Sequence, residues 1–204
     1  MPTFRFERQC DARPVAGIDE AGRGPLAGPV IAAAVVLDME RLPRRVARRI
    51  DDSKQLPAAE REELFALVRP YAAIGVGGAS VTEIDAINIL RATYVAMRRA
   101  VTRLPVRPAV ALVDGNGAPE LPCAVRTIVD GDALSLSIAA ASIVAKVTRD
   151  RLMTLLARHH PGYGWEHNAG YATEEHRQAL VRLGPTPHHR RSFRPVYECL
   201  PITI

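Results

Sequence analysis

Short apolar runs alternate with stretches of helical periodicity along the chain, and together they predict strands interleaved with helices. The apolar runs predict strands over residues 15–20, 29–37, 72–79, 109–113 and 124–129. Residues with helical spacing or helix-start signals predict helices over 41–50, 57–68, 81–104, 136–157 and 173–183. Strands that alternate with long helices are typical of the α/β class, so we expect an α/β fold.

The predicted helix termini and loops carry recognisable local signals. Ser80 and Glu83 form an S-x-x-E capping box at the start of the helix over 81–104. The apolar stripe expected on that helix consists of Ile84, Ile87, Leu90, Tyr94 and Met97. Gly184 stands where a helix-ending glycine is expected. We expect a loop over residues 159–172, and we expect the Pro- and Arg-rich tail over about 185–204 to pack on the surface.

Composition and length indicate one globular domain over residues 1–204, including that tail. Hydrophobic residues make up 48% of the 204 residues and charged residues 24%, which excludes wholesale disorder. No apolar run approaches the ~18 residues that span a bilayer, and the N-terminus lacks the apolar core of a secretory signal. The three cysteines of the chain lie far apart without a C-x-x-C motif, so we expect neither disulfides nor a thiolate zinc site. We therefore expect a cytoplasmic protein.

The positive charge is compatible with a polyanionic partner. Lysine and arginine number 27 against 22 acidic residues, a net charge of +5. Only Lys54 and Lys146 are lysines, and the remaining basic residues are arginines. Two interpretations stay open on composition alone. The lysines either mark places that need a compact ammonium group or are survivors of a bias toward arginine.

Acidic residues recur in one local pattern, in which an apolar strand is followed by an acid and a glycine. The three segments are VAGIDEAGRG, ALVDGN and RTIVDGD. Carboxylates at strand ends can converge over one edge of a sheet, where they repel unless a cation neutralises them. Oxygen ligands without His or Cys favour Mg²⁺ or Mn²⁺. Ordinary turn chemistry explains the same pattern about equally well, so the residues alone leave both interpretations open.

Longer motifs identify a family resemblance that covers the chain from about residue 15 to residue 196. In order, they are GIDEAGRGPLAGPVIAAAVVL, DSKQL, VDGN, GDALSLSIAAASIVAKVTRD, HPGYGWEHNAGYAT and HRRSFRPV. In the residues of these motifs, and in their order and spacing, the chain resembles ribonuclease HII. The resemblance implies an RNase H-like mixed sheet flanked by helices, with helical C-terminal elements along the substrate groove. It also implies an endonuclease that hydrolyses the RNA strand of RNA/DNA hybrids and cuts at ribonucleotides embedded in duplex DNA, leaving 3′-hydroxyl and 5′-phosphate ends.

The resemblance further implies the metal site. It assigns two Mn²⁺ or Mg²⁺ ions to Asp19, Glu20, Asp114 and Asp132, with water as the nucleophile. Neighbouring residues of a regular strand point to opposite faces, so we expect the chain to twist or to leave the strand near Gly22 if Asp19 and Glu20 are both to reach the metals. Asp130 is expected to be an exposed turn residue.

Substrate contacts also follow from the resemblance. It implies that the backbone of Gly22, Arg23 and Gly24 contacts the 2′-hydroxyl of the ribonucleotide. Substrate phosphates would be contacted by Ser53 and Lys54 in the DSK turn and by Lys146 on the second long helix. The ring of Tyr171 would pack on the neighbouring sugar. The expected partners are RNA/DNA hybrids and duplex DNA with embedded ribonucleotides. We expect the protein to be a monomer and not to bind a membrane. Two alternatives remain, namely a nuclease of the same architecture that acts on DNA alone and a non-catalytic nucleic-acid binding module.

Overall fold

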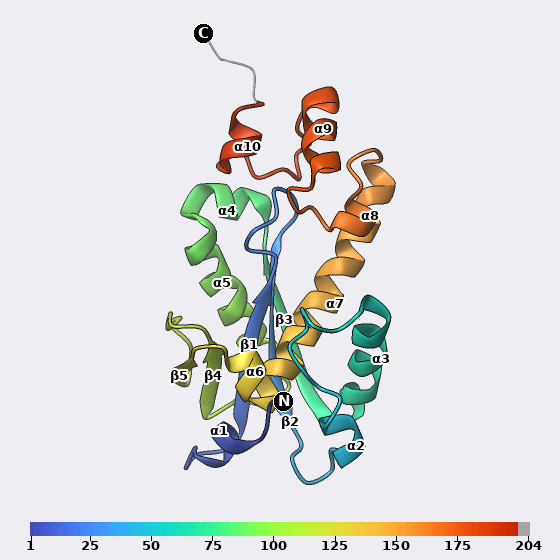
Figure 1. Cartoon of the computed structure of the whole chain (residues 1–204). Coiled ribbons are helices and arrows are strands. Elements are labelled where there is room, and N and C mark those ends of the chain that lie inside the picture. The colour runs from blue at the N-terminus through green and yellow to red at the C-terminus, as the bar shows by residue number, and fades with distance from the viewer. Residues whose placement is uncertain (200–204) are drawn as a thin grey trace.

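A five-stranded mixed sheet forms the centre of the molecule (Figure 1), in the strand order β3-β2-β1-β4-β5. The computed structural model describes residues 1–199. The strands are β1 (Val15–Ala21), β2 (Val30–Leu37), β3 (Ala72–Ala79), β4 (Val110–Asp114) and β5 (Ala124–Ile128). The first three are antiparallel neighbours, whereas β4 and β5 run parallel to β1. The predicted α/β fold with a mixed sheet is confirmed.

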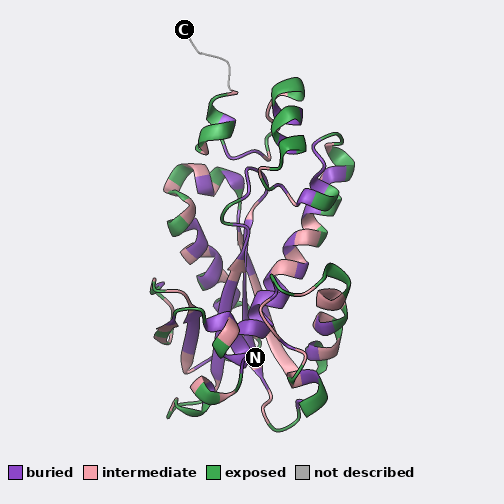
Figure 2. Cartoon of the chain, viewed as in Figure 1, coloured by how far each residue is buried: buried purple, intermediate pink, exposed green. Residues whose placement is uncertain are grey.

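One long helix covers each face of the sheet. On one face, Ala33 and Val35 of β2 pack in a cluster with the apolar side of α7 (Leu136–His159). On the other face, Ala32 and Ala34 pack in a cluster with α5 (Ile89–Thr102). Consecutive residues of a strand point to opposite faces, so an uninterrupted apolar strand such as β2 contributes to both cores. Buried residues accordingly line the sheet and the inner sides of both helices (Figure 2).

Close approach of α7 to β1 depends on a glycine. A Cβ added at Gly17 would lie 2.1 Å from the carbonyl carbon of Ser137, well inside the contact distance of any real side chain. Since Gly17 belongs to β1 and Ser137 to the first turn of α7, this contact places the start of the helix directly on the strand. That packing brings α7 beside the strand that carries Asp19 and Glu20.

Shorter helices complete the layers around the sheet. They are α1 (Arg5–Arg8), α2 (Arg44–Ala47), α3 (Ala58–Val68), the 3-10 turn η1 (Arg69–Tyr71), α4 (Val81–Ile87), α6 (Gly131–Leu134), α8 (Trp165–Asn168), α9 (Glu174–Leu183) and α10 (Arg194–Tyr197). Helices α9 and α10 lie at one end of the molecule, beyond the tip of the sheet, and are largely exposed (Figures 1 and 2). Within residues 1–199, no helix is both long and apolar enough to cross a membrane.

The predicted helix over 81–104 was wrong as a single element. It divides at Asn88, whose φ of 67° interrupts α-helical geometry and separates α4 from α5. Asn88 then caps α5 by accepting a hydrogen bond from the Arg91 amide. Leu90 is 44% exposed and does not belong to the apolar stripe, because the break shifts the face that α5 presents to the sheet. The capping box of Ser80 and Glu83 is confirmed.

Three smaller differences concern the other helix and loop predictions. The helix expected over 41–50 is only one turn long, α2. The loop expected over 159–172 contains α8. The tail expected on the surface buries His189 and Arg190, which are 1% and 0% exposed. Residues 200–204 of that tail lie outside the described part of the chain.

Candidate active site

Strand register brings two of the predicted acids side by side. Ile18 of β1 pairs with Val113 of the parallel strand β4, so the next residues, Asp19 and Asp114, lie at the same level of the sheet. Asp132 lies in α6, which begins shortly after β5, the strand on the other side of β4. The site therefore forms where neighbouring parallel strands end, which is the usual position of a site in an open α/β sheet.

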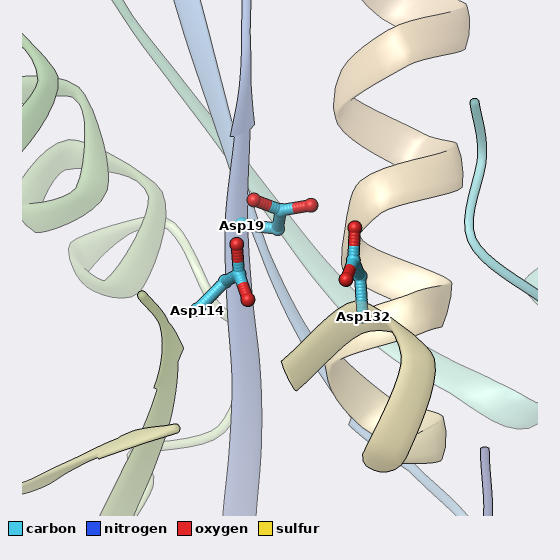
Figure 3. Close-up of side chains that lie close together, drawn as sticks. All are labelled: Asp19, Asp114 and Asp132. Atoms are coloured by element: carbon cyan, nitrogen blue, oxygen red, sulfur yellow. The ribbon is translucent and has the colours of Figure 1, made fainter. Parts of the chain in front are cut away.

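The three aspartates converge on one point (Figure 3). Each offers a carboxylate oxygen, and these oxygens all lie within 4.8 Å of one another. Asp19 and Asp132 are each 5% exposed, so water screens their charges poorly. Two full negative charges at this separation repel by roughly 3–4 kcal/mol at an effective dielectric constant of 20. Such a cluster is stable in its charged form only when a cation offsets the repulsion.

The surroundings of two of these carboxyl groups favour their protonated forms. Burial raises the pKa of Asp19 well above its usual value, and the neighbouring charges of Glu20 and Asp114 add to the increase. Burial and the charge of Asp132 raise the pKa of Asp114. Hydrogen bonds from the Glu20 amide to Asp19 and from the Gly131 amide to Asp114, both 2.7 Å long, oppose these increases. Protons thus compete with a cation, whose affinity should rise with pH.

A hard divalent cation fits this donor set. The converging ligand atoms are carboxylate oxygens only, without a histidine or cysteine among them. Oxygen-only sites suit Mg²⁺ and Mn²⁺, whereas zinc sites usually contain nitrogen or sulfur. The residues that would hold such an ion are Asp19, Asp114 and Asp132.

Glu20, the fourth predicted metal ligand, lies next to this trio without belonging to it. It follows Asp19 inside β1, and the strand continues to Ala21 before Gly22 turns with a φ of 97°. Glu20 instead approaches Arg23, with Oε1 3.4 Å from Nη1. Burial raises the pKa of Glu20, the Arg23 guanidinium lowers it, and the charge of Asp114 raises it. Glu20 is therefore within electrostatic reach of the trio, on the side where Arg23 lies.

The two residues predicted to bind phosphate in the DSK turn occupy different environments. Lys54 reaches the acids, because its Nζ lies 3.1 Å from Oδ2 of Asp132. Ser53 is buried, and its hydroxyl lies 2.7 Å from the hydroxyl of Ser142 on α7. The side chain of Ser142 in turn hydrogen-bonds to Asp19 and lowers its pKa. In this position the buried Ser53 hydroxyl supports Ser142, the neighbour of Asp19, and its predicted contact with a phosphate stays a prediction.

Lys146 and Tyr171 line a groove beside the acids. Its volume is about 910 Å³, and its walls come from α3, α7 and the segment over 165–171. The Nζ atom of Lys146 lies 2.7 Å from Oδ1 of Asp150 and 5.6 Å from the centre of the Tyr171 ring. Tyr171 is 44% exposed, so its ring is available to a ligand. The three aspartates lie outside the lining of this groove.

The fold requires glycine at position 22 but not at position 24. Gly22 is buried with a positive φ, and an added Cβ would lie 2.0 Å from Nε of Arg149. Gly24 is exposed and has no positive φ, and a Cβ there would have only Cε1 of Tyr171 nearby, at 3.9 Å. The fold therefore requires a glycine at position 22, whereas at position 24 space remains open beside the Tyr171 ring.

Sequence reasoning missed three residues that support this site, namely Ser142, Arg149 and Arg190. Arg149 is completely buried and donates hydrogen bonds to the backbone carbonyls of Ala27, Pro29 and Ala169. Arginine is abundant in this chain, so composition could not distinguish a buried arginine from an exposed one. For Asp130, which is exposed with a φ of 53°, the structure agrees with the predicted turn residue.

Comparison with known proteins identifies the family. The family model described as ribonuclease HII matches residues 16–196. The chain belongs to the ribonuclease HII family. A ribonuclease HII from Paramagnetospirillum magneticum is 65% identical over 182 residues, which cover 89% of this chain and 90% of that protein. The predicted recognition of the family is confirmed.

Solved structures agree with this assignment to ribonuclease HII. The crystal structure of ribonuclease H2 from Pyrococcus horikoshii has a TM-score of 0.75 and 28% identity, covering 91% of this chain and 96% of that one. Bst-RNase HIII in complex with Mn²⁺ has a TM-score of 0.78 at 18% identity, covers 98% of this chain and 73% of that one, and shares the fold. As a ribonuclease HII, the chain is a metal-dependent endonuclease with ribonuclease H activity on RNA/DNA hybrids.

Proposed function

We propose that this ribonuclease HII cuts duplex DNA at single embedded ribonucleotides as well as the RNA strand of hybrids. It acts as a monomer with two divalent ions, Mn²⁺ or Mg²⁺, and leaves 3′-hydroxyl and 5′-phosphate ends. The observation that carries the proposal is the convergence of three carboxylates from separate elements within 4.8 Å, a few residues along the chain from the exposed Arg23 and Gly24. The first feature suits phosphodiester hydrolysis, and the second suits recognition of a ribose.

In this proposal the acids hold the metals and no side chain attacks the phosphate. Asp19, Asp114 and Asp132 supply the converging ligand oxygens, and Glu20 supplies a further carboxylate from the Arg23 side. Bound divalent ions activate water and stabilise the leaving oxygen in reactions of this class. The hydrogen bond from the Gly131 amide and the support of Ser142 keep Asp114 and Asp19 aimed at the cluster.

Recognition of the ribonucleotide belongs to Gly22, Arg23, Gly24 and Tyr171. A 2′-hydroxyl both donates and accepts hydrogen bonds, and it is the feature that separates RNA from DNA at the cut. The open space at Gly24, next to the half-exposed ring of Tyr171, lets a sugar approach the backbone. Tyr171 would then pack on the neighbouring deoxyribose, where a second hydroxyl would be crowded.

The test of this function uses three duplexes of one sequence. One carries a single ribonucleotide, the second a complete RNA strand, and the third is DNA only. We expect cleavage of the first two in Mn²⁺ or Mg²⁺ and none in excess chelator. Cleavage of the DNA-only duplex would favour the DNA nuclease, and binding without cleavage would favour the binding module. Activity that persists in chelator would refute the metal assignment.

Replacing Lys146 with alanine should weaken substrate binding and reduce its salt dependence. Lys146 is a compact positive charge in the wall of the groove, although Asp150 neutralises part of that charge. Loss of one phosphate contact lowers the slope of log K against log salt by about 0.9 for a B-form duplex. The control is Arg45→Ala, which removes an exposed charge on α2 and should leave the slope unchanged. Equal slopes for wild type and Lys146→Ala would show that Lys146 does not contact a phosphate.

A further inference from the structure

The C-terminal segment (residues 185–199) inserts the side chain of Arg190 beneath the glycine segment (residues 22–24) of the proposed recognition site. Arg190 is completely buried, although it lies in the tail that sequence analysis expected on the surface. Its guanidinium group donates to the carbonyl oxygens of Gly22 (2.5 Å), Arg23 (2.8 Å) and Gly28 (2.8 and 3.0 Å). One side chain therefore holds both ends of the turn between β1 and β2, across a separation of more than 160 residues.

Holding these carbonyls determines where the following amides point. A peptide unit is planar and trans, so its C=O and the next N–H point in opposite directions. With the carbonyls of Gly22 and Arg23 turned inward to Arg190, the amides of Arg23 and Gly24 face away from it. Both residues are exposed, and within residues 1–199 neither amide donates a hydrogen bond to the protein. The two donors are thus free to bind a ligand beside Tyr171.

The arrangement is energetically demanding, which argues against an incidental contact. All hydrogen bonds of the Arg190 guanidinium go to backbone carbonyls, and a second buried arginine, Arg149, lies close enough to repel it. Burial together with that repulsion lowers the pKa of Arg190 to about 9. A planar guanidinium can bond three separate carbonyls at once, whereas a lysine ammonium cannot reproduce this fork.

We propose that Arg190 is a positioning residue for ribonucleotide recognition, because it aims the amides of Arg23 and Gly24 at the 2′-hydroxyl. This inference rests on the proposed function, in which the same segment reads the ribose. It adds that the C-terminal segment, although distant in sequence from the acids, determines selectivity for the sugar without contacting the substrate.

A second contact holds this segment in place from the exposed side. The carboxylate of Asp85 on α4 accepts hydrogen bonds from the amides of Arg191 and Ser192 and from the hydroxyl of Ser192. These residues directly follow Arg190, so Asp85 fixes the backbone next to it. Substitution of Asp85 therefore loosens the backbone beside Arg190 and removes a negative charge that raises the pKa of Arg190, while it leaves the residues of the site unchanged.

The experiment measures selectivity of binding in the absence of cleavage. Wild type, Arg190→Lys and Asp85→Ala are titrated in chelator with two duplexes that differ only in a single 2′-hydroxyl, and thermal unfolding of each protein is recorded. In wild type we expect tighter binding of the ribonucleotide duplex. In Arg190→Lys we expect the ratio of the two affinities to fall by about tenfold, as loss of hydrogen bonds to the hydroxyl requires. Affinity for the DNA-only duplex should stay unchanged.

A stability control separates positioning from simple destabilisation. Met97→Ala creates a cavity under α5, on the opposite face of the sheet from α7, and should lower the melting temperature without changing the affinity ratio. If Arg190→Lys does not fold, Asp85→Ala carries the test and should lower the ratio in the same direction. A folded Arg190→Lys that keeps the wild-type ratio overturns the inference. Absence of any preference in wild type would instead refute ribose recognition, and thus the proposed function.

Discussion

Replacing Asp114 with asparagine should lower the rate of cleavage at least about a thousandfold, which corresponds to about 4 kcal/mol of transition-state stabilisation. Asparagine keeps the shape of the side chain and an oxygen that can accept the 2.7 Å hydrogen bond from the Gly131 amide. It removes the negative charge that lies among the carboxylates of Asp19 and Asp132. The variant should therefore keep its fold and lose its hold on a divalent cation.

The same substitution should stabilise the metal-free protein, and the pKa shift of Asp114 gives the sign. Burial and Asp132 raise its pKa in the folded state, so the folded protein holds this proton more tightly than the unfolded chain. Stability associated with this group is then present below the unfolded pKa and falls as pH rises toward the folded value. At neutral pH the charged carboxylate opposes folding, so in chelator Asp114→Asn should melt at or above the wild-type temperature.

Single-turnover cleavage at saturating Mn²⁺ and thermal melting in chelator test both expectations. The matched control is Asp130→Asn, the same chemical change two residues from Asp132, at an exposed position whose φ of 53° asparagine tolerates. This control should retain wild-type activity. If Asp114→Asn retained most of its turnover, Asp114 would be a turn residue and the proposed metal site would be wrong.

Valine substitutions at Gly22 and Gly24 should have opposite consequences for folding and for activity. At position 24 a side chain meets only Cε1 of Tyr171, at 3.9 Å, so Gly24→Val should fold with nearly wild-type stability. The added methyl groups fill the space through which a sugar would approach, and cleavage at a single ribonucleotide should fall by at least about a hundredfold. At position 22 the Cβ overlaps Arg149 and φ is 97°, so Gly22→Val should unfold or melt far below wild type.

Thermal melting and cleavage of the single-ribonucleotide duplex, measured for both variants, check this pair. Strain from a positive φ costs about 1–3 kcal/mol, before the overlap with Arg149 is counted. An unstable Gly24→Val would show that the fold requires this glycine as well. A stable Gly24→Val with full cleavage would show that the substrate does not approach the backbone there.

Local sequence determined the elements that carry the acids. Apolar runs predicted all five strands within one or two residues of their observed bounds, because burial in a sheet demands apolar residues over a short, continuous stretch. An acid after or within such a run lies near a strand end, and neighbouring parallel strands place those ends together. The strand-end pattern was thus compatible with convergence of acids, but only the family resemblance selected Asp19, Asp114 and Asp132, and neither predicted the separate position of Glu20.

Tertiary structure alone decided which residues support the site. The burial of Ser53 depends on how α7 packs on the sheet, since its hydroxyl lies against Ser142 of that helix, and no local pattern records that packing. Arg190 contacts carbonyls 167 and 168 residues away in sequence, and Arg149 fills the space that makes Gly22 obligatory. Local sequence specifies backbone propensity and the hydrophobic face of each element. Contacts between distant segments arise only when the folded chain brings their polar groups together, because the energy of a buried guanidinium depends on partners supplied from elsewhere in the fold.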